Sequence, residues 1–389
     1  MAAEHVVGLN PKVLIWARER AGLTLEDAAG RIKRGAATLT AWEEGKKAPT
    51  FKQLEALAET VYHRPIALFF FPAPPEEPEP GRVFRTLPTE EVDKLLPDTL
   101  YAMREGMAFR ESLIELTGGS NPAARLITRD IRAVPGEDVE ALAKRVRDYL
   151  GIDVAQQFRW DDKDAALKAW RQAVEDAGVF VFKRAFKQKG ISGLCLNDQV
   201  FPLILVNNST AHSRQQFTIF HELGHLLFAV SGITKDDAGF IRRMTGASRD
   251  IEVACNKFAA EFLVPTSSFP WNEFRDLRDL DNKVRNVASR YRVSREVILR
   301  RLLDRGLVTD ELYEQRAREW NKEFLDWKAG RKPGGNYYAT QAIYLGPSYL
   351  ALAFGRLYAG RVTMPELADH LGVKAQNIPR LEAYIGAEV

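Results

Sequence analysis

His221-Glu222-Leu223-Gly224-His225 is the most informative stretch of this chain, because it has the pattern H-E-x-x-H. It follows Phe217-Thr218-Ile219-Phe220, an apolar run that suits a helix. On a helix, positions four apart share a face, so both imidazoles can reach one metal ion. Glu222 stands beside the first histidine and can accept a proton from a water at that metal. The pattern therefore predicts zinc peptidase chemistry, with Zn2+ as the cofactor and Glu222 as the general base.

A catalytic zinc site usually has three protein ligands, so a third ligand is needed beside the two histidines. The acidic candidates near His225 are Asp236, Asp237, Asp250, Glu252 and Glu261. Glu252 and Asn256 share one face of a helix expected over 251–263, whereas Glu261 falls on the opposite face. We therefore take Glu252 as the third metal ligand and Asn256 as a group that orients a ligand. Glu252 could instead be an ordinary glutamate at a helix N-terminus, the histidines could be plain core residues, and Mn or Fe could replace zinc.

The composition is that of an ordinary globular chain. A length of 389 residues predicts two or three domains. The 55 basic and 52 acidic residues nearly balance, so a claim of DNA binding must rest on a local element. Cys195 and Cys255 are too few for a disulfide framework and suit a reducing compartment. With no apolar leader near Met1 and no run long enough to span a bilayer, we expect a cytoplasmic protein without membrane contact.

Linker-like segments divide the chain, which we expect to be multidomain and mainly α, with a small β-sheet. A run rich in proline and glutamate marks one boundary, and a run rich in glycine, proline and lysine marks another. The expected parts are a five-helix domain over 1–72, a linker over 73–94, a central domain over 95–305, a helical connection and linker over 306–337, and a C-terminal helical module over 338–389. Within the central domain we expect a helical lead-in over 95–175 and a catalytic part over 176–270. No internal repeat is visible in the sequence.

Apolar periodicity predicts the elements of the central domain. Spacings of three and four residues predict helices over 100–116, 139–150, 164–176, 251–263 and 282–303. After Gly178 the period changes, and three short runs predict strands over 179–182, 191–196 and 201–206.

The last of these strands comes just before the H-E-x-x-H helix. In peptidases of this design an edge strand binds the substrate backbone by strand addition. We therefore expect a substrate-binding strand made of Leu203, Ile204, Leu205, Val206 and Asn207. A plain buried strand is the alternative interpretation.

Four segments carry a family resemblance in their order and spacing: residues 190–193, 205–207, 214–225 and 252–265. With them, residues of about 175–305 resemble the ImmA/IrrE family of metallo-endopeptidases. The resemblance implies an α+β thermolysin-like (gluzincin) zinc fold in which Glu222 is the general base and His221, His225 and Glu252 are ligands. Members of this family typically cleave a repressor protein, which releases genes for stress response or mobile-element transfer.

A second resemblance covers residues 11–71, where Leu23 to Ala29 and Thr38 to Thr50 resemble the Xre/Cro class of helix-turn-helix domains. The residues expected at DNA are Lys33, Arg34, Thr38, Thr40, Lys46 and Lys47. The four cations would contact phosphates, which position a domain without selecting a sequence. Alanines occupy several places where such a helix usually carries polar side chains, and Trp42 is expected in the core. The domain could therefore bind a protein partner, or its own peptidase part, instead of DNA.

Together the two resemblances predict a DNA-binding regulator that carries a zinc metallo-endopeptidase. The expected partners are DNA, through residues 11–71, and a protein substrate, either a repressor or the product of a neighbouring gene; the chain could also form a homodimer. The expected setting is a stress response, a mobile element or a toxin–antitoxin module. The alternative is a transcriptional regulator or antitoxin whose metal site is not catalytic. Glu222 favours the peptidase, because a structural zinc site needs no general base.

Overall fold

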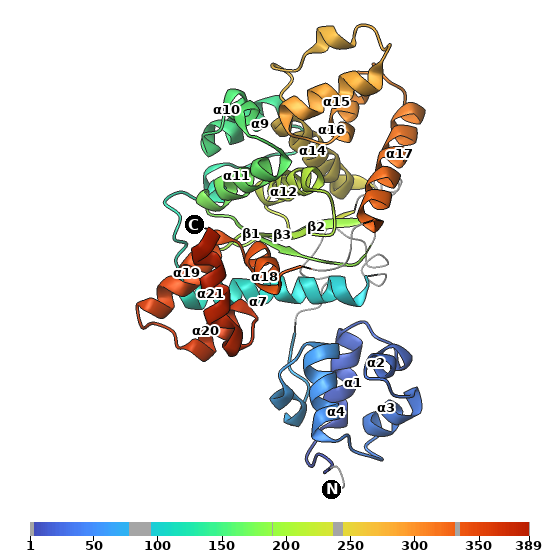
Figure 1. Ribbon diagram of the computed structural model, residues 1–389, viewed down its shortest axis with the longest axis vertical. Coiled ribbons are helices and arrows are strands. Elements are labelled where there is room, and N and C mark those ends of the chain that lie inside the picture. The colour runs from blue at the N-terminus through green and yellow to red at the C-terminus, as the bar shows by residue number, and fades with distance from the viewer. Residues whose placement is uncertain (1–3, 78–94, 189, 236–243, 331–334, 389) are drawn as a thin grey trace. The chain divides into compact units, whose positions relative to one another are not determined.

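The computed structural model describes residues 4–77, 95–188, 190–235, 244–330 and 335–388. Most of the expected linker over 73–94, and part of the second linker, lies outside these residues. The elements described are mainly helices, with one four-stranded sheet (Figure 1). The chain forms two compact units, and among the described residues the division falls between Glu105 and Gly106. No helix in the described ranges is long and apolar enough to cross a membrane.

Short helices with polar caps build the first unit. They are α1 (Pro11–Arg20), α2 (Leu25–Arg31), α3 (Ala36–Glu43) and α4 (Phe51–Glu55), followed by the π-helical η1 (Ala56–Tyr62) and the 3-10 segment η2 (Ile66–Phe70). Asn10 caps α1 and Thr24 caps α2, where Thr24 and Asp27 form a reciprocal capping box. Within residues 4–77 these are four α-helices, with η1 continuing directly from α4, so the five-helix count expected for residues 1–72 is not confirmed.

The core of the first unit lies between these helices. Leu14, Leu39 and Leu54 are fully buried, and Trp42 is only 3% exposed. The expectation that Trp42 belongs to the core is therefore confirmed. Beside this core Arg18 Nε donates to Glu43 Oε1 at 2.8 Å, and Nη2 donates to Oε2 at 3.0 Å. This two-point ion pair fixes α1 against α3.

The second unit is built on one mixed sheet. Its strands are β1 (Phe180–Arg184), β2 (Ile191–Leu196), β3 (Leu203–Asn207) and β4 (Gly232–Lys235), in the order β1-β3-β2-β4. β1 and β3 are parallel, and β2 is antiparallel to both β3 and β4. Every residue of β1, β2 and β3 is buried, because helices cover both faces of the sheet (Figure 1). The first three strands were expected, whereas β4 was not.

Helices cover the sheet in layers. One face carries α11 (Lys163–Asp176) against β1 and α12 (His212–Leu227) against β2 and β3. α14 (Gly246–Leu263) packs on α12, with the rings of Phe220 and Phe262 stacked at 3.9 Å. The opposite face carries the part of α7 (Pro97–Thr117) from Gly106 onward, where the rings of Phe109 and Phe182 stack at 4.1 Å. Between α7 and α11 along the chain lie three shorter helices: α8 (Ile127–Asp130), α9 (Val139–Leu150) and α10 (Val154–Arg159).

The remaining helices follow α14 along the chain. They are the 3-10 segment η3 (Trp271–Phe274), α15 (Leu280–Tyr291), α16 (Arg295–Asp304), α17 (Asp310–Ala329), α18 (Tyr337–Leu345), α19 (Pro347–Tyr358), α20 (Met364–Leu371), the 3-10 segment η4 (Ala375–Asn377) and α21 (Ile378–Glu388). The single helix expected over 282–303 is wrong, because it is two helices. Arg292 adopts a left-handed conformation with φ of 58°, which ends α15, and Ser294 then caps α16.

The C-terminal helices pack on the sheet. α18 lies against β1 (Figure 1). Arg171 Nη1 donates to the carbonyl of Ile343 at 2.8 Å, and the ring of Tyr349 meets that of Phe182 edge-on at 5.1 Å. The outer edge of β1 is therefore occupied by the chain's own C-terminal part.

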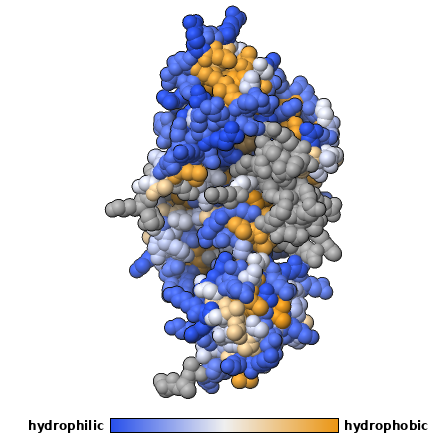
Figure 2. Space-filling model, turned by 90° about the vertical axis from the view of Figure 1, so that its right-hand side faces the viewer, coloured by the Kyte–Doolittle hydropathy of each residue, from blue (hydrophilic) through white to orange (hydrophobic). Residues whose placement is uncertain are grey.

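The face of the molecule in Figure 2 is mostly hydrophilic, with separate hydrophobic patches between the hydrophilic regions. The most exposed large apolar side chains come from distant elements, for example Val7, Phe51, Trp327 and Tyr358. Scattered apolar residues of this kind are normal on a protein surface and do not by themselves indicate a partner.

Candidate metal centre

The H-E-x-x-H segment lies in the C-terminal half of α12, the helix sandwiched between the sheet and α14. His221, Glu222 and His225 are completely buried there. Three buried ionisable groups in adjacent turns are costly unless they find partners. The groups that surround these three side chains therefore indicate the function of this part of α12.

His221, His225 and Glu252 converge on one point. The two Nε2 atoms lie 3.0 Å apart, and Glu252 Oε2 lies 3.3 Å from the Nε2 of His221. Glu252 Oε1 lies 3.2 Å from the Nε2 of His225. Within the described residues these three form the group able to hold a metal ion, with all ligand atoms within 4.8 Å of one another. Two imidazoles and a carboxylate are a donor set that suits zinc.

α14 supplies Glu252, and the structure separates it from the other acidic candidates. Glu261 lies on the far side of α14, where it accepts from Arg301 Nη2 at 2.5 Å and from the backbone N–H of Thr266 at 2.7 Å. Asp250 is exposed at the start of α14. Asp236 and Asp237 lie outside the described residues.

Asn256 lies one turn after Glu252, as expected. Its Oδ1 is 3.1 Å from the Nδ1 of His221. A proton on Nδ1 would make this a hydrogen bond from the ring to the amide oxygen. It would also direct the lone pair of Nε2 toward the point where the three ligands meet. The geometry supports the orienting role predicted for Asn256.

Glu222 points to the sheet side of α12. Its Oε1 accepts a hydrogen bond from the hydroxyl of Thr234 on β4. Its Oε2 is buried and has no hydrogen-bond partner among the described residues. Burial raises the pKa of Glu222, against the opposing charges of His225 and His221. A buried carboxylate oxygen without a partner, beside three converging ligands, fits a site that holds a metal and a water.

Burial also acts on the pKa of Glu252 and would raise it. The charges of His225 and His221, and their hydrogen bonds to the carboxylate, outweigh that effect and hold the pKa of Glu252 below its ordinary value. Glu252 is therefore ionised at neutral pH, which is the form that binds a metal.

Sequence reasoning missed several residues around Glu222. Thr234 lies on the strand that was not expected. Gly193 on β2 leaves the room that Glu222 needs, since a Cβ there would lie 3.1 Å from Glu222 Oε1 and 2.4 Å from Thr218 Cγ2. Cys255 packs under α12, where a Cβ on Gly224 would lie 3.1 Å from its Sγ. The only sequence signal for Gly193 was its place in the segment 190–193.

The substrate strand predicted over Leu203, Ile204, Leu205, Val206 and Asn207 is wrong as an edge strand. These residues form β3, which pairs with β1 on one side and β2 on the other. An interior strand has no free backbone groups for an added strand. The alternative interpretation, a buried strand, is the one that the structure supports.

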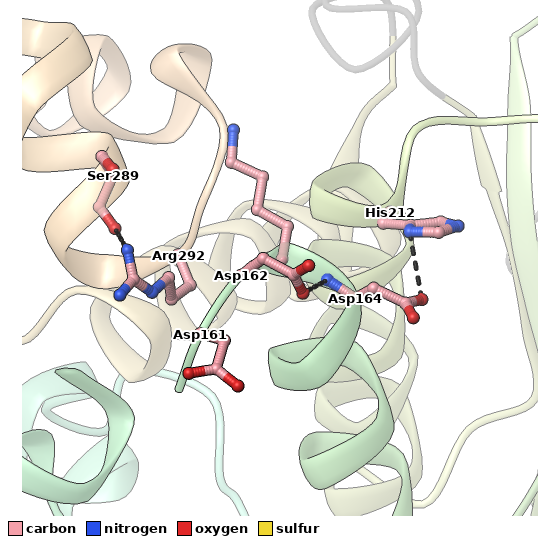
Figure 3. Close-up of a pocket in the computed structure, with 7 residues that line it drawn as sticks. Asp161, Asp162, Asp164, His212, Ser289 and Arg292 are labelled. Carbon is pink, nitrogen blue, oxygen red and sulfur yellow. Dashed lines mark hydrogen bonds and ion pairs between the residues drawn. The ribbon is translucent and has the colours of Figure 1, made fainter. Parts of the chain in front are cut away.

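A pocket of about 420 Å³ opens at the start of α11 and α12, away from the H-E-x-x-H segment. Figure 3 shows Asp161, Asp162, Asp164, His212, Ser289 and Arg292 around it. Several of its polar groups have partners within the chain: His212 Nδ1 pairs with Asp164 at 3.3 Å, and Asp162 caps α11. None of the converging ligands lines this pocket, so we place the chemistry at His221, His225 and Glu252 and not here.

The residues expected at DNA surround α3 in the first unit. Lys33 and Arg34 are exposed before it, and Lys46 and Lys47 are exposed after it. Thr38 is half-buried. The hydroxyl of Thr40 donates to the carbonyl of Ala36 at 3.1 Å, so the helix backbone already uses it. The cations are available to phosphates as predicted, but the hydrogen-bonding capacity of α3 itself is small.

Two segments of the chain match family models. Residues 174–303 match the IrrE N-terminal-like domain of peptidase family M78, and residues 14–65 match a helix-turn-helix domain. The first match runs from the end of α11 through the sheet, α12 and α14 into α16, so it contains the whole candidate metal centre. No curated protein matches the chain. The chain therefore joins a helix-turn-helix domain to an IrrE N-terminal-like domain, as the two resemblances predicted.

Proposed function

We propose that the second unit is a zinc-dependent endopeptidase. The observation that carries this proposal is the arrangement at α12: two Nε2 atoms and a carboxylate within 3.3 Å of one another, beside a buried glutamate oxygen without a partner. A purely structural zinc site has four protein ligands and no free carboxylate beside it. The set of three ligands plus Glu222 is the arrangement of a catalytic site.

Each residue has a defined task in this proposal. Zinc held by His221, His225 and Glu252 would polarise a peptide carbonyl and make a water acidic enough to attack it. Glu222 would accept the proton of that water at Oε2 and would then give it to the leaving amine. Thr234 donates to Oε1, which leaves Oε2 as the oxygen available for this proton transfer. Burial of the whole site excludes bulk water and strengthens these charge interactions.

We further propose that the substrate backbone binds along β4. The outer edge of β1 is covered by α18, whereas β4 pairs only with β2 among the described strands. β4 also carries Thr234, which holds the general base. A peptide added to this edge would lie beside the base in an extended conformation, as in other cases of strand addition.

The first unit is proposed to bring the peptidase to DNA. The helix-turn-helix match, with exposed Lys33, Arg34, Lys46 and Lys47 around α3, supports contacts to phosphates. The whole protein would be a cytoplasmic DNA-binding regulator. It would cleave a repressor or the product of a neighbouring gene, in a stress response, a mobile element or a toxin–antitoxin module.

Metal analysis and a cleavage assay test the peptidase. Purified protein should carry one zinc per chain, and His221→Ala should lose it. Glu222→Gln should keep the zinc and lose cleavage of the product of the adjacent gene by about 100-fold or more. Glu140→Gln, a change of the same kind at an exposed site on α9, is the matched control and should cleave normally. If wild type and Glu222→Gln bind zinc equally and neither cleaves the adjacent product or a resident repressor, the metal site is not catalytic.

A further inference from the structure

The segment from the start of α2 into α3 has a counterpart near the C-terminus, which begins with the same kind of helix cap. Thr24 and Asp27 form the capping box that begins α2, and Thr363 and Glu366 form the same box at the start of α20. The threonine hydroxyl donates to the carboxylate at 2.9 Å in the first case and at 2.8 Å in the second. Thr363 stands 339 positions after Thr24, and the positions that follow keep this offset.

The backbone of the turn repeats at the same offset. The N–H of Arg34 donates to the carbonyl of Ala29 at 2.9 Å, and that of Val373 donates to the carbonyl of Ala368 at 3.0 Å. The residue before each donor has a left-handed conformation, with φ of 56° at Lys33 and 62° at Gly372. The same left-handed ending closes other helices of the chain, for example α15 at Arg292, so the two segments are related by the common offset of cap, turn and buried positions and not by the turn alone.

The buried positions repeat as well. Ala29 and Ala368, the small residues that let the two helices approach, are both buried. Leu39 and Ile378 are fully buried at the start of the second helix of each pair, and Trp42 and Leu381 follow three residues later with 3% and 1% exposure. Few of these residues are identical, which is why the sequence shows no internal repeat. The second copy, residues 363–381, lies outside the segments that match family models.

The two copies differ on the outward face of their second helix. The first copy has the exposed Ala37 and the half-buried Ala41 there. At the same places the second copy presents Gln376 and Arg380, which are both exposed, with Asn377 half-buried beside them. Glutamine and asparagine pair with adenine, and arginine pairs with guanine, through two hydrogen bonds in the major groove. The second copy therefore has the base-reading groups that the first copy lacks.

We propose that α20, η4 and α21 form a second helix-turn-helix that binds double-stranded DNA, in which Gln376 and Arg380 contact base edges. A helix of this motif enters the major groove with its N-terminal residues toward the bases, and these residues lie at the N-terminal end of η4 and α21. Lys374, exposed just before them, is placed to meet a phosphate.

The net charge of residues 347–388 predicts how DNA binding by the second copy will depend on salt and on sequence. Residues 347–388 contain four basic and four acidic residues, so they add little general attraction to phosphates. The second copy should therefore change which sequence is bound much more than it changes the salt dependence of binding. The four exposed cations around α3 should dominate the salt dependence.

Selection from a pool of random duplex DNA with the full chain tests the proposal. Wild type should enrich a defined sequence. Gln376→Ala/Arg380→Ala should bind that duplex more weakly, by roughly 5- to 150-fold for each lost two-bond contact, and should enrich a shorter or altered sequence. Arg361→Ala removes an exposed arginine from the turn before α20 and is the matched control, which should enrich the wild-type sequence. The melting temperature shows whether each variant is folded. Gln376→Ala and Arg380→Ala, tested singly, should each weaken binding to the wild-type duplex, and each result is independent evidence for a base contact.

The outcomes separate this inference from DNA binding by the first unit. If the double variant enriches the wild-type sequence with unchanged affinity, the C-terminal copy does not contact bases and the inference is overturned. DNA binding by the first unit then still stands if Lys33→Ala/Arg34→Ala weakens binding to all sequences alike. If wild type enriches no sequence, base reading by either copy is excluded.

Discussion

Gly193→Ala should destabilise the second unit, because the new Cβ would clash with the methyl group of Thr218. A second substitution that removes this methyl group should relieve part of the clash. The new Cβ would lie 2.4 Å from Thr218 Cγ2, 3.0 Å from the carbonyl oxygen of Leu205 and 3.1 Å from Glu222 Oε1. Real Cβ atoms do not approach to 2.4 Å, so α12 must move from β2. Overpacking of this kind costs about 1–3 kcal/mol.

Thr218→Ser removes the methyl group in question and keeps the hydroxyl that donates to the carbonyl of Arg214. Alone it should cost about 1 kcal/mol, through one lost buried methyl group. In the double variant the worst contact is absent, so the two costs should not add. We expect a coupling of about 1–2 kcal/mol in favour of the double variant. The contacts to Leu205 and Glu222 remain, so recovery should be partial.

Urea unfolding measures these differences. With a slope of about 3 kcal/mol per molar, a loss of about 2 kcal/mol moves the midpoint down by about 0.7 M. Gly355→Ala is the matched control in the same unit, since a Cβ there meets nothing within 4 Å, and it should be neutral or slightly stabilising. If Gly193→Ala unfolds at the wild-type midpoint, or if the double variant loses the full sum of the two single costs, the close packing of β2 on α12 does not exist as described.

Three further predictions follow from other parts of the second unit. Asn256→Ala should weaken zinc binding by about 10- to 100-fold, measured by competition with a chelator, because His221 loses the group that orients it. Arg301→Met should lower stability by about 3–5 kcal/mol, because the buried Glu261 loses its partner, while zinc content stays at the wild-type level; loss of zinc would instead make Glu261 part of the metal site. Burial and the nearby charge of Arg171 lower the pKa of Lys183 from 10.5 to about 7. The unfolded chain therefore binds more protons between pH 7 and about 10. Stability should rise with pH in that range by roughly 3–4 kcal/mol more in wild type than in Lys183→Met. Equal slopes in chemical unfolding would contradict this.

The local elements of the fold could be predicted well. The helices α9, α11 and α14 and the strands β1 to β3 lie close to their expected ranges. The predicted helix over 282–303 failed at Arg292, because a left-handed residue that is not glycine leaves no clear mark in the apolar pattern. β4 was missed because it has only four residues, too few for a period to show.

The sequence by itself determined what depends on neighbours within a few turns. The four-residue spacing of His221 and His225 places both on one face of any helix, and Thr24 with Asp27 caps α2 wherever that helix lies. The same helical geometry places Glu252 and Glu261 on opposite faces of one helix, so the sequence alone distinguishes the metal-ligand candidate from the other glutamate.

Only the tertiary structure decided what depends on packing between distant segments. It placed β3 inside the sheet and β4 at its edge, brought Thr234 to Glu222, and paired Glu261 with Arg301. It also revealed that residues 363–381 repeat the turn of residues 24–42. The physical reason is the same in each case. Strand order, buried pairing and a shared backbone turn arise from how whole elements pack, and many different local sequences satisfy the same packing.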